Sequence, residues 1–507
     1  MNKIILVIVL FTTAISLIGC TDSDVTVPDF YGMEYGDAVQ WASDNDIRLI
    51  PTSEYNNDVM EREIFTQNIE AGTKISIKSE ISIVYSRGKD PDTIVEVPLF
   101  LTMTKEEIET WLSDNGIKKY NFYESFDLAT EKDQLIDFNI NNQAQRDITV
   151  IGDTFNFYFS TGSLEAEEVL FEGLDKWRGV NLGGWFVLEG WMTPDLFSGV
   201  NGSDETVFMQ QKQNAETVIE EHWDTFITEA DFEWLKDKGI EYVRLPIPWW
   251  LFGVEAYEGT AQEVSYKSSV FYIDRAMVWA ETHDIKVLLD LHTAPGGQNG
   301  FDNGGLTGIR EWGNNESTTH YVETTTNVLV DITEHYSQFD SFWGIELLNE
   351  PSWDVNTSVL QNFYIDTYEK IREINQDVWI GMHDGFKSYD ANIWRSFFNN
   401  NDFDKVFFDI HIYSVFTDDI KQYDIFEHLD YVTDVHGTRI TTYDNIVPVV
   451  IGEWSHAMPN AATYGLHNEA VREAVIAFGN RQFNVYDTAQ GWFFWNYKID
   501  RSSHLEW

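Results

Sequence analysis

Residues 342–351 read Phe-Trp-Gly-Ile-Glu-Leu-Leu-Asn-Glu-Pro, an apolar run of strand length that ends in polar side chains and a proline. Short apolar runs of this kind are typical of buried strands. Seven more occur between residues 177 and 495. The eight predicted strands are Trp177–Leu182, Tyr242–Ile247, Lys286–Leu291, Phe342–Leu348, Val378–Met382, Val406–Ile412, Val447–Ile451 and Gly491–Trp495.

Segments with the period of an amphipathic helix separate most of these runs. They are Glu221–Lys238, Phe271–Thr282, Thr319–Ser337, Val359–Asn375 and Asn468–Arg481. Strands that alternate with helices pair in parallel through βαβ units. Eight units in one domain predict an α/β fold of the (β/α)8 TIM barrel type. The competing doubly wound sheet usually has fewer strands, and no Gly-x-Gly-x-x-Gly follows the first run.

Polar and aromatic side chains occur at the carboxyl end of every run. In strand order they are Asn181 and Glu189, Arg244, His292, Asn349 and Glu350, His383 and Asp384, His411 and Tyr413, Glu453, and Trp495. Any one of them could be an ion-pair partner or a packed core residue. Eight coincidences at the same strand end are implausible, and active sites of such barrels lie at that end.

Two carboxylates at strand ends, Glu350 and Glu453, suggest hydrolysis of a glycosidic bond. One carboxylic acid must protonate the leaving oxygen, and an ionised carboxylate must attack or activate water. The apolar residues before Glu350 predict a raised pKa for its carboxyl group. Arg244 and Tyr413 are expected to keep Glu453 ionised. Sequence spacing gives no distance, so retention and inversion both stay open.

Composition excludes several classes of partner and site. The chain has 507 residues, 33 Lys plus Arg against 84 Asp plus Glu, and a net charge of −51. Nucleic acid is not expected, because phosphate binding needs clustered basic residues. A single cysteine allows neither an internal disulfide nor a cysteine-based metal site. We expect no metal and no cofactor, since His-Glu-x-x-His and nucleotide loops are absent and acid-pair chemistry needs no ion.

The N-terminus resembles a bacterial lipoprotein signal. Lys3 precedes an apolar run, Ile4–Ile18, that is short for a membrane span and ends at Gly19-Cys20. Residues 1–19 are therefore expected to be a signal peptide and Cys20 a lipid anchor. This predicts a membrane-anchored protein of the cell envelope. An ordinary signal peptide or an anchor helix with an incidental cysteine is the alternative.

An internal repeat with an offset of 70 residues follows. Val27-Pro28 recurs at Val97-Pro98, and the helix-like segment around Trp41 recurs around Trp111. The repeat predicts two small α+β modules, residues 25–88 and 94–162. Both resemble PASTA domains, the second less closely, since Leu99 stands where Asp is usual. That resemblance implies binding to peptidoglycan fragments or a spacer role, and the spacer is the favoured interpretation.

The barrel region, residues 165–507, resembles the exo-β-1,3-glucanase branch of glycoside hydrolase family 5. The motifs are Arg178-Gly-Val-Asn-Leu-Gly-Gly-Trp-Phe-Val-Leu-Glu189, Leu291-His-x-Ala-Pro-Gly-x-Gln-Asn-Gly-Phe-Asp302, Gly344-Ile-Glu-Leu-Leu-Asn-Glu-Pro351, Gly452-Glu-Trp-Ser455 and Gly491-Trp-Phe-Phe-Trp495. The resemblance implies a retaining enzyme. Glu350 matches the general acid/base and Glu453 the nucleophile.

The same resemblance implies a set of substrate-binding residues. Asn349 matches the residue that binds the sugar 2-hydroxyl, Arg244 and Tyr413 orient the nucleophile, and Trp495 is a stacking floor. The remaining matches are His292 and His411 around the sugar, Glu189 and Asp302 as hydroxyl-binding acids, and Phe301 and Phe416 as a clamp on the next sugar.

Three hypotheses follow. The first is an anchored retaining exo-acting glucanase on β-1,3-glucan. The second is a family 5 enzyme with endo action or another linkage preference, such as β-1,6, and the products distinguish these two. The third is a non-catalytic surface lipoprotein that binds glycan or cell wall. The presence of both carboxylates, Glu350 and Glu453, speaks against the third.

Overall fold

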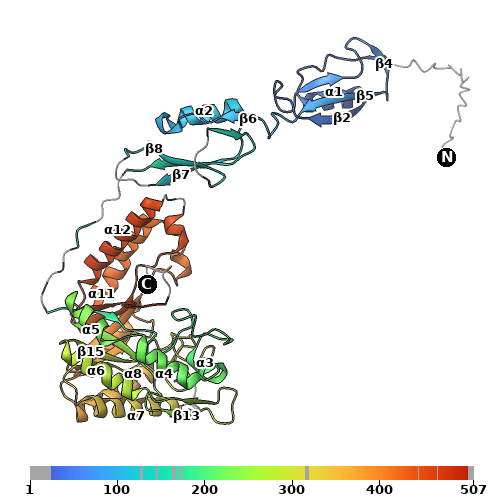
Figure 1. Ribbon diagram of the computed structural model, residues 1–507. Coiled ribbons are helices and arrows are strands. Elements are labelled where there is room, and N and C mark those ends of the chain that lie inside the picture. Colours follow the sequence, from blue (N-terminus) through green and yellow to red (C-terminus); the bar gives the residue numbers. More distant parts are fainter. Residues whose placement is uncertain are drawn as a thin grey trace, which may run out of the picture. The chain divides into compact units, whose positions relative to one another are not determined.

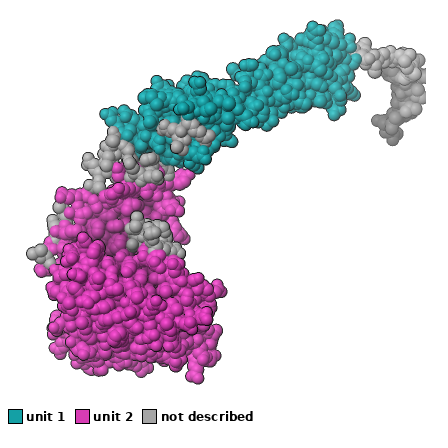
Figure 2. All heavy atoms as spheres, viewed as in Figure 1, with its two compact units in different colours: residues 1–163 teal, residues 164–507 magenta. Residues whose placement is uncertain are grey.

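The computed structural model describes residues 24–125, 130–143, 147–162, 167–169, 171, 173, 175–314, 319–443, 445–464, 466 and 468–500. The chain divides into two compact units, residues 1–163 and 164–507 (Figure 2). The predicted signal peptide and Cys20 lie outside the described residues. None of the helices in the described ranges combines the length and apolar character needed to cross a membrane.

The first unit contains two modules with the same strand topology (Figure 1). In each, a three-stranded sheet has its central strand parallel to one neighbour and antiparallel to the other, and a two-stranded sheet lies beside it. The first module comprises β1 (Asp24–Thr26), α1 (Tyr35–Asp44), β2 (Arg48–Glu54), β3 (Ile64–Gln67), β4 (Lys74–Ser76) and β5 (Glu80–Ser86). The second comprises β6 (Ile94–Glu96), η1 (Phe100–Thr102), α2 (Lys105–Asn115), β7 (Tyr120–Ser125), β8 (Leu135–Ile140), β9 (Ile148–Val150) and β10 (Phe155–Ser160).

Local sequence explains the helix of the second module. Thr104 and Glu107 form a capping box at the start of α2, and Gly116 ends the helix at a φ of 73°. Such caps satisfy the amide and carbonyl groups that a helix leaves open at its ends. The buried face of α2 presents Ile108 and Leu112 to the aromatic residues of the sheet. The module therefore has a core of its own.

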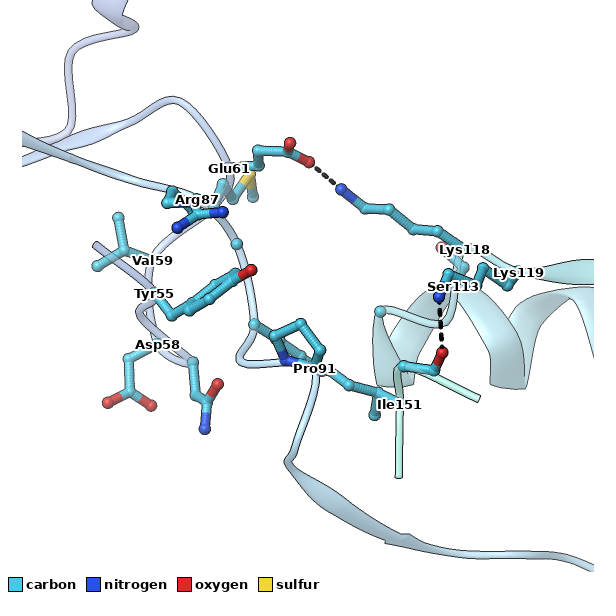
Figure 3. Close-up of a pocket in the computed structure, with 16 residues that line it drawn as sticks. Tyr55, Asp58, Val59, Glu61, Arg87, Pro91, Ser113, Lys118, Lys119 and Ile151 are labelled. Atoms are coloured by element: carbon cyan, nitrogen blue, oxygen red, sulfur yellow. Dashed lines mark hydrogen bonds and ion pairs between the residues drawn. The ribbon is translucent and has the colours of Figure 1, made fainter. Parts of the chain in front are cut away.

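A cavity of about 530 Å³ in the first unit is lined by residues of both modules (Figure 3). The Arg87 guanidinium lies 4.3 Å from the centre of the Tyr55 ring. Lys118 forms an ion pair with Glu61, and Lys119 Nζ donates to the Gly152 carbonyl at 3.1 Å. The cavity thus gathers basic side chains in a strongly acidic chain, each with a neighbouring partner.

The second unit is a closed barrel of eight parallel strands, which confirms the predicted fold (Figure 1). Neighbouring strands follow chain order, as expected for successive βα units. They are β11 (Trp177–Asn181), β12 (Tyr242–Ile247), β15 (Lys286–Leu291), β16 (Phe342–Glu346), β17 (Trp379–His383), β18 (Val406–Ile412), β19 (Val449–Trp454) and β20 (Gly491–Phe494). Each overlaps the run predicted for it.

Helices and one hairpin connect these strands. The helical segments are α3 (Glu205–Gln211), α4 (Ala215–Thr225), α5 (Glu229–Asp237), α6 (Val270–Thr282), α7 (Thr319–Tyr336), α8 (Thr357–Ile374), α9 (Ala391–Asn400), η3 (Asp418–Ile420), α10 (Ile425–Tyr431), η4 (Val432–His436), α11 (Gly437–Tyr443), η5 (Asn460–Thr463) and α12 (Asn468–Tyr486). The hairpin is β13 (Val254–Ala256) with β14 (Val264–Tyr266). The single helix predicted over Glu221–Lys238 is wrong, because Thr228 and Asp231 form a capping box that starts a second helix.

The amino-terminal end of the barrel is filled by aromatic and aliphatic side chains. Trp177 packs edge to face on Trp343 and Trp379, with ring centres 4.7 and 4.6 Å apart. Phe407 and Phe493 belong to the same buried cluster. Because this end is packed and apolar, the polar interior lies toward the carboxyl ends of the strands.

Candidate active site

A cavity of about 1090 Å³ is lined by residues that follow the carboxyl ends of the barrel strands. It brings together most of the predicted site residues: Glu189, Phe301, Asp302, Glu350, His411, Tyr413, Phe416, Glu453 and Trp495. The other three lie beside them. Arg244 bonds to Glu453, Asn349 bonds to Arg244, and the His292 ring stacks on Trp495 with centres 5.8 Å apart.

Glu453 is buried and held by both of its carboxylate oxygens. Arg244 Nη1 donates to Oε1 at 2.9 Å, and the Tyr413 hydroxyl donates to Oε2 at 2.8 Å. Burial raises the pKa of Glu453 above its ordinary value, while the neighbouring His411 and Arg244 cations oppose that rise. Two donors thus fix the orientation of this carboxylate.

The backbone around Glu453 departs from regular pairing. The register between β18 and β19 shifts between Ile410 and His411, so that His411 pairs with Glu453. The Gly452 amide, one residue before Glu453, donates to Asp409 Oδ1 at 2.7 Å. A Cβ at position 452 would overlap the Asp409 carboxylate. Irregular strand pairing of this kind changes the direction of side chains next to active sites. Here it requires glycine at position 452.

Arg244 is the centre of a buried charge network. Besides Glu453 it contacts Glu346 at 2.8 Å, Asp290 at 3.1 Å and Asn349 at 2.8 Å. Its side chain is fully buried, as are those of Asp290 and Glu346. A buried guanidinium needs such partners, because an uncompensated charge in the interior is costly. The network holds the Arg244 guanidinium beside the Glu453 carboxylate.

Glu350 occupies a strained position at the end of β16. Its φ of 44° lies in the left-handed region, although Pro351 follows it and favours extended backbone at the preceding residue. His411 Nδ1 lies 2.8 Å from Oε1, and Asn303 Nδ2 donates to Oε2 at 2.8 Å. Strain of this kind persists where surrounding contacts hold the residue, and it concentrates at functional sites.

The expected rise in the pKa of Glu350 is wrong. Burial does raise it, but the hydrogen bond and positive charge of His411 outweigh that effect and lower the pKa of Glu350 to about 2. Glu453, Asp409 and Glu350 in turn hold the pKa of His411 well above its ordinary value, despite burial. The proton of this cluster therefore resides on the imidazole, next to Glu350.

Glu350, His411 and Glu453 each offer an oxygen or nitrogen atom within 4.8 Å of the others. A carboxylate oxygen of Glu350 is thus no farther than that from one of Glu453. Retaining glycosidases hold their two carboxyl groups about 5–5.5 Å apart, whereas inverting enzymes need about 6.5–9.5 Å for a water molecule. The close approach of these two oxygen atoms favours the retaining geometry.

Several buried polar atoms around the pair have no hydrogen-bond partner among the described residues. Three of them are Glu189 Oε1, His292 Nε2 and Asn349 Nδ2. Buried polar groups are normally paired, so these atoms are available to sugar hydroxyls. Burial and the nearby Asp302 hold the pKa of Glu189 well above its ordinary value. The protonated form can both donate and accept a hydrogen bond.

Aromatic side chains complete the cavity. Trp495 is buried, and Gly183 allows it to lie close to the first βα loop, since a Cβ there would come within 2.6 Å of the indole. Phe301 and Phe416 are exposed at the rim. Aromatic faces bind the apolar face of a sugar ring. The cavity therefore offers a buried floor and an exposed aromatic entrance.

Two groups of three side chains could in principle hold a metal ion within the described ranges. One is Glu350, His411 and Glu453, and the other is Glu346, Asp409 and His411. In both, the His411 ring nitrogens already face carboxylates at 2.8 and 3.3 Å. The acid-pair chemistry that Glu350 and Glu453 can perform requires no ion.

Residues 203–500 match the cellulase family, glycosyl hydrolase family 5, and this match spans more than half of the chain. The chain belongs to glycoside hydrolase family 5. The motif resemblance is thereby confirmed at family level, and the protein is a glycoside hydrolase. Residues 25–87 match the PASTA domain, which confirms the resemblance of the first module.

Relatives of this family 5 enzyme include two fungal proteins. Glucan 1,3-beta-glucosidase of Blumeria graminis is 32% identical over 391 residues, covering 68% of this chain and 87% of that protein. Probable glucan 1,3-beta-glucosidase A of Emericella nidulans is 31% identical over 364 residues, covering 64% and 86%. Rutinosidase from Aspergillus niger shares the fold, with a TM-score of 0.51 and 22% identity over 66% of this chain and 92% of that one.

Sequence reasoning missed several members of the family 5 site. Asp290, Glu346 and Asp409 are fully buried acids inside strands, and Asn303 bonds to Glu350. A signal for the three acids existed. Each interrupts an otherwise apolar strand of a sheet buried on both faces, where a charge needs a partner. Asn303 lies in a loop and gave no such signal.

Proposed function

We propose that this enzyme is a retaining exo-acting glucanase that releases glucose from the non-reducing ends of β-1,3-glucan. The observation that carries the mechanism is the close approach of the Glu350 and Glu453 carboxylates, within 4.8 Å. The β-1,3 linkage is supported by the fungal relatives, which are named as glucan 1,3-beta-glucosidases. The reaction is a double displacement through a covalent glycosyl-enzyme.

In the first step, the Glu453 carboxylate attacks the anomeric carbon while the bond to the leaving oxygen breaks. Arg244 and Tyr413 hold the attacking group in one orientation. Such positioning lowers the barrier because little orientational freedom remains to be lost. Asn349 Nδ2 is the available donor for the sugar 2-hydroxyl, whose hydrogen bond strengthens in the transition state.

His411 supplies the proton that Glu350 needs as a general acid. The proton moves from His411 Nδ1 to Glu350 Oε1 across 2.8 Å, and the carboxylic acid then protonates the departing oxygen. Glu350 is left as a carboxylate. In the second step it accepts a proton from water, which attacks the anomeric carbon of the glycosyl-enzyme and displaces Glu453 as a carboxylate. The proton then returns from Glu350 to His411, which restores the starting state.

Exo action is supported by the segments that follow β11 and β15. They are joined by hydrogen bonds from the Thr307 amide to Asp204 Oδ2 at 3.1 Å and from Thr206, in α3, to the Gly305 carbonyl. Glu189 and Asp302 lie in these segments and line the cavity. We infer that the joined segments, with their hydroxyl-binding acids, stop the glucan chain at its terminal sugar.

Product analysis on β-1,3-, β-1,6- and β-1,4-glucans tests this proposal. We expect glucose as the sole early product, and only from β-1,3-glucan at a high rate. Glu453→Gln serves as the matched inactive control. A ladder of oligosaccharides would indicate endo action. Faster hydrolysis of β-1,6-glucan would contradict the proposed β-1,3 preference. Glycan binding without turnover would favour a non-catalytic role.

We further propose that Cys20 carries a lipid that anchors the enzyme to the cell envelope, and that the two modules act as a spacer. The lipoprotein-like sequence before Cys20 supports the anchor. Detergent phase partitioning of the expressed protein, compared with Cys20→Ser, tests it. Sedimentation of the Glu453→Gln full chain with purified peptidoglycan tests the alternative in which the PASTA module binds cell wall.

A further inference from the structure

Four adjacent loops each present one exposed aromatic side chain to the catalytic cavity. The strands β15, β16, β17 and β18 are neighbours in the barrel. The loops that follow them carry Phe301, Trp353, Tyr389 and Phe416, exposed by 40, 58, 63 and 68% respectively, and all four line the cavity. Large exposed aromatics that cluster in this way mark a binding surface.

These aromatics lie on the leaving-group side of the scissile bond. Glu350 protonates the leaving oxygen, so the departing part of the substrate lies next to it. Trp353 is three residues beyond Glu350 on the same loop. Glu189 and Trp495, by contrast, follow β11 and β20, which are not neighbours of β16 or β17. The departing chain must therefore pass the loops after β16, β17 and β18.

Trp353 and Tyr389 are each supported by an arginine. Arg310 lies 5.7 Å from the Trp353 ring centre and forms an ion pair with Asp354 at 2.8 Å. The guanidinium of Arg439 lies 4.6 Å from the Tyr389 ring centre. A cation over one face of a ring favours a fixed ring position. The two rings are thus held in place although they are exposed.

Hydrogen bonds to a buried carboxylate hold the loop that carries Tyr389. Asp384 is buried and accepts hydrogen bonds from the Phe386 amide at 2.9 Å, the Ser388 amide at 3.1 Å and Arg439 Nη2 at 2.7 Å. Phe386, which also lines the cavity, adopts a φ of 57°. Strained backbone held by buried charges indicates a preorganised binding loop.

We propose that Trp353 and Tyr389 are stacking platforms for glucosyl units beyond the one next to the cleaved bond. The enzyme then favours β-1,3-glucan chains of three or more units over the disaccharide. This inference rests on the proposed function and identifies the part of the glucan that Trp353 and Tyr389 bind. Rigid aromatic faces bind sugar rings with little loss of side-chain freedom.

Hydrolysis rates for β-1,3-linked oligosaccharides of two to five units test the proposal. We expect kcat/KM of the wild type to rise with chain length. Trp353→Ala and Tyr389→Ala should each lower kcat/KM on the tetrasaccharide by about fivefold to tenfold, with little effect on 4-nitrophenyl β-glucoside. Tyr389→Phe, which keeps the ring, should retain the wild-type dependence. Trp234→Ala removes an indole that is 51% exposed on α5 and serves as the control.

The outcomes separate this inference from the proposed function. Equal losses on the aryl glucoside and the tetrasaccharide would mean that the two residues only support the loops, and unchanged chain-length dependence would mean that they bind no sugar. Either result would contradict the stacking role of Trp353 and Tyr389 and would leave the proposed β-1,3-glucanase activity unaffected. A wild type that cleaves the aryl glucoside but no β-1,3-glucan overturns both.

Discussion

Glu350 combines backbone strain with two hydrogen bonds that hold its carboxylate. The positive φ before Pro351 aims the side chain at His411 and Asn303, each 2.8 Å away. Unlike Glu453, Glu350 has no contact with the Arg244 guanidinium among the interactions of the described residues. The two carboxylates share His411, which lies 3.5 Å from Glu453 Oε2, but they differ in their other partners. Such a difference in surroundings is the condition for different roles.

Replacing Glu350 with Gln should separate acid catalysis from nucleophilic attack. Glu350→Gln keeps the shape but cannot donate the catalytic proton. We expect kcat/KM on β-1,3-glucan to fall by about 10²–10⁴-fold, and by much less on 2,4-dinitrophenyl β-glucoside, whose leaving group needs no proton. Steady-state kinetics on both substrates measure this. Equal losses on the two substrates would argue against an acid role for Glu350.

Replacing His411 with Asn should change the pH dependence. In the wild type the catalytic proton is held by His411, whose pKa lies well above its ordinary value, so activity declines only when alkaline pH removes that proton. In His411→Asn the carboxyl of Glu350 must hold the proton itself, and its pKa rises from about 2 because the cation is gone. We expect the alkaline limb of kcat/KM to move to lower pH. A limb that stays in place would show that His411 does not hold the proton.

At the residue scale, sequence predicts which side chains meet but not their protonation. The motifs around Glu350 and Glu453 predicted that the two carboxylates lie in one site, and both line the same cavity. The predicted direction of the Glu350 pKa was wrong because the hydrogen bond and charge of His411 outweigh the effect of burial. His411, from a strand two positions away in the barrel, determines it instead.

Among the elements, the end of β19 shows how an irregular strand positions a side chain. Gly452 leaves room for the Asp409 carboxylate and donates its amide to it. This contact coincides with the register shift that places Glu453 opposite His411. The absence of a side chain at Gly452 is therefore linked to the orientation of the Glu453 side chain.

Gly452→Ala should impair both folding stability and catalysis. The added methyl group overlaps Asp409, so either the strand or the carboxylate must move. We expect a loss of about 1–3 kcal/mol in the free energy of unfolding together with reduced kcat. Urea titration and steady-state kinetics measure the two effects, and Gly437→Ala, where the nearest atom lies at 3.4 Å, is the control. Unchanged stability and activity would contradict the role given to this glycine.

Barrel strands were easier to predict than the helices around them. Strand runs are nearly continuous in apolar residues because helices cover the sheet. The ten-residue α9 was not predicted, although Trp394, Phe397 and Phe398 are buried on one face at helical spacing. The break between α4 and α5 depends on a capping box at Thr228. Capping contacts of this kind can end a helix within a segment of helical periodicity, and a single sequence indicates them only weakly.

For the whole molecule, buried neutral histidines predict a loss of stability in mild acid. Burial lowers the pKa of His222 and His383 to about 4 and that of His436 to about 3. Their pKa in the unfolded chain is about 6.5. Between these values the unfolded chain binds protons that the folded chain does not, so stability falls as pH decreases. Groups with raised pKa values act in the opposite direction, among them His411, Glu189, Glu205 and Glu346.

We expect His222→Gln to lose less stability than the wild type, or to gain more, when the pH changes from 7 to 5. The comparison isolates this histidine, because the other titrating groups are present in both proteins. Differential scanning calorimetry at the two pH values measures the difference in melting temperature. An equal change in melting temperature for the two proteins would contradict this account.

The central claim is that Glu350 and Glu453 act on one glycosidic bond from the separation of a retaining enzyme. Proton NMR of glucose during the first minutes of β-1,3-oligosaccharide hydrolysis tests this most directly. The account predicts that β-glucose forms first and converts only later to the equilibrium mixture. Initial formation of α-glucose would contradict it.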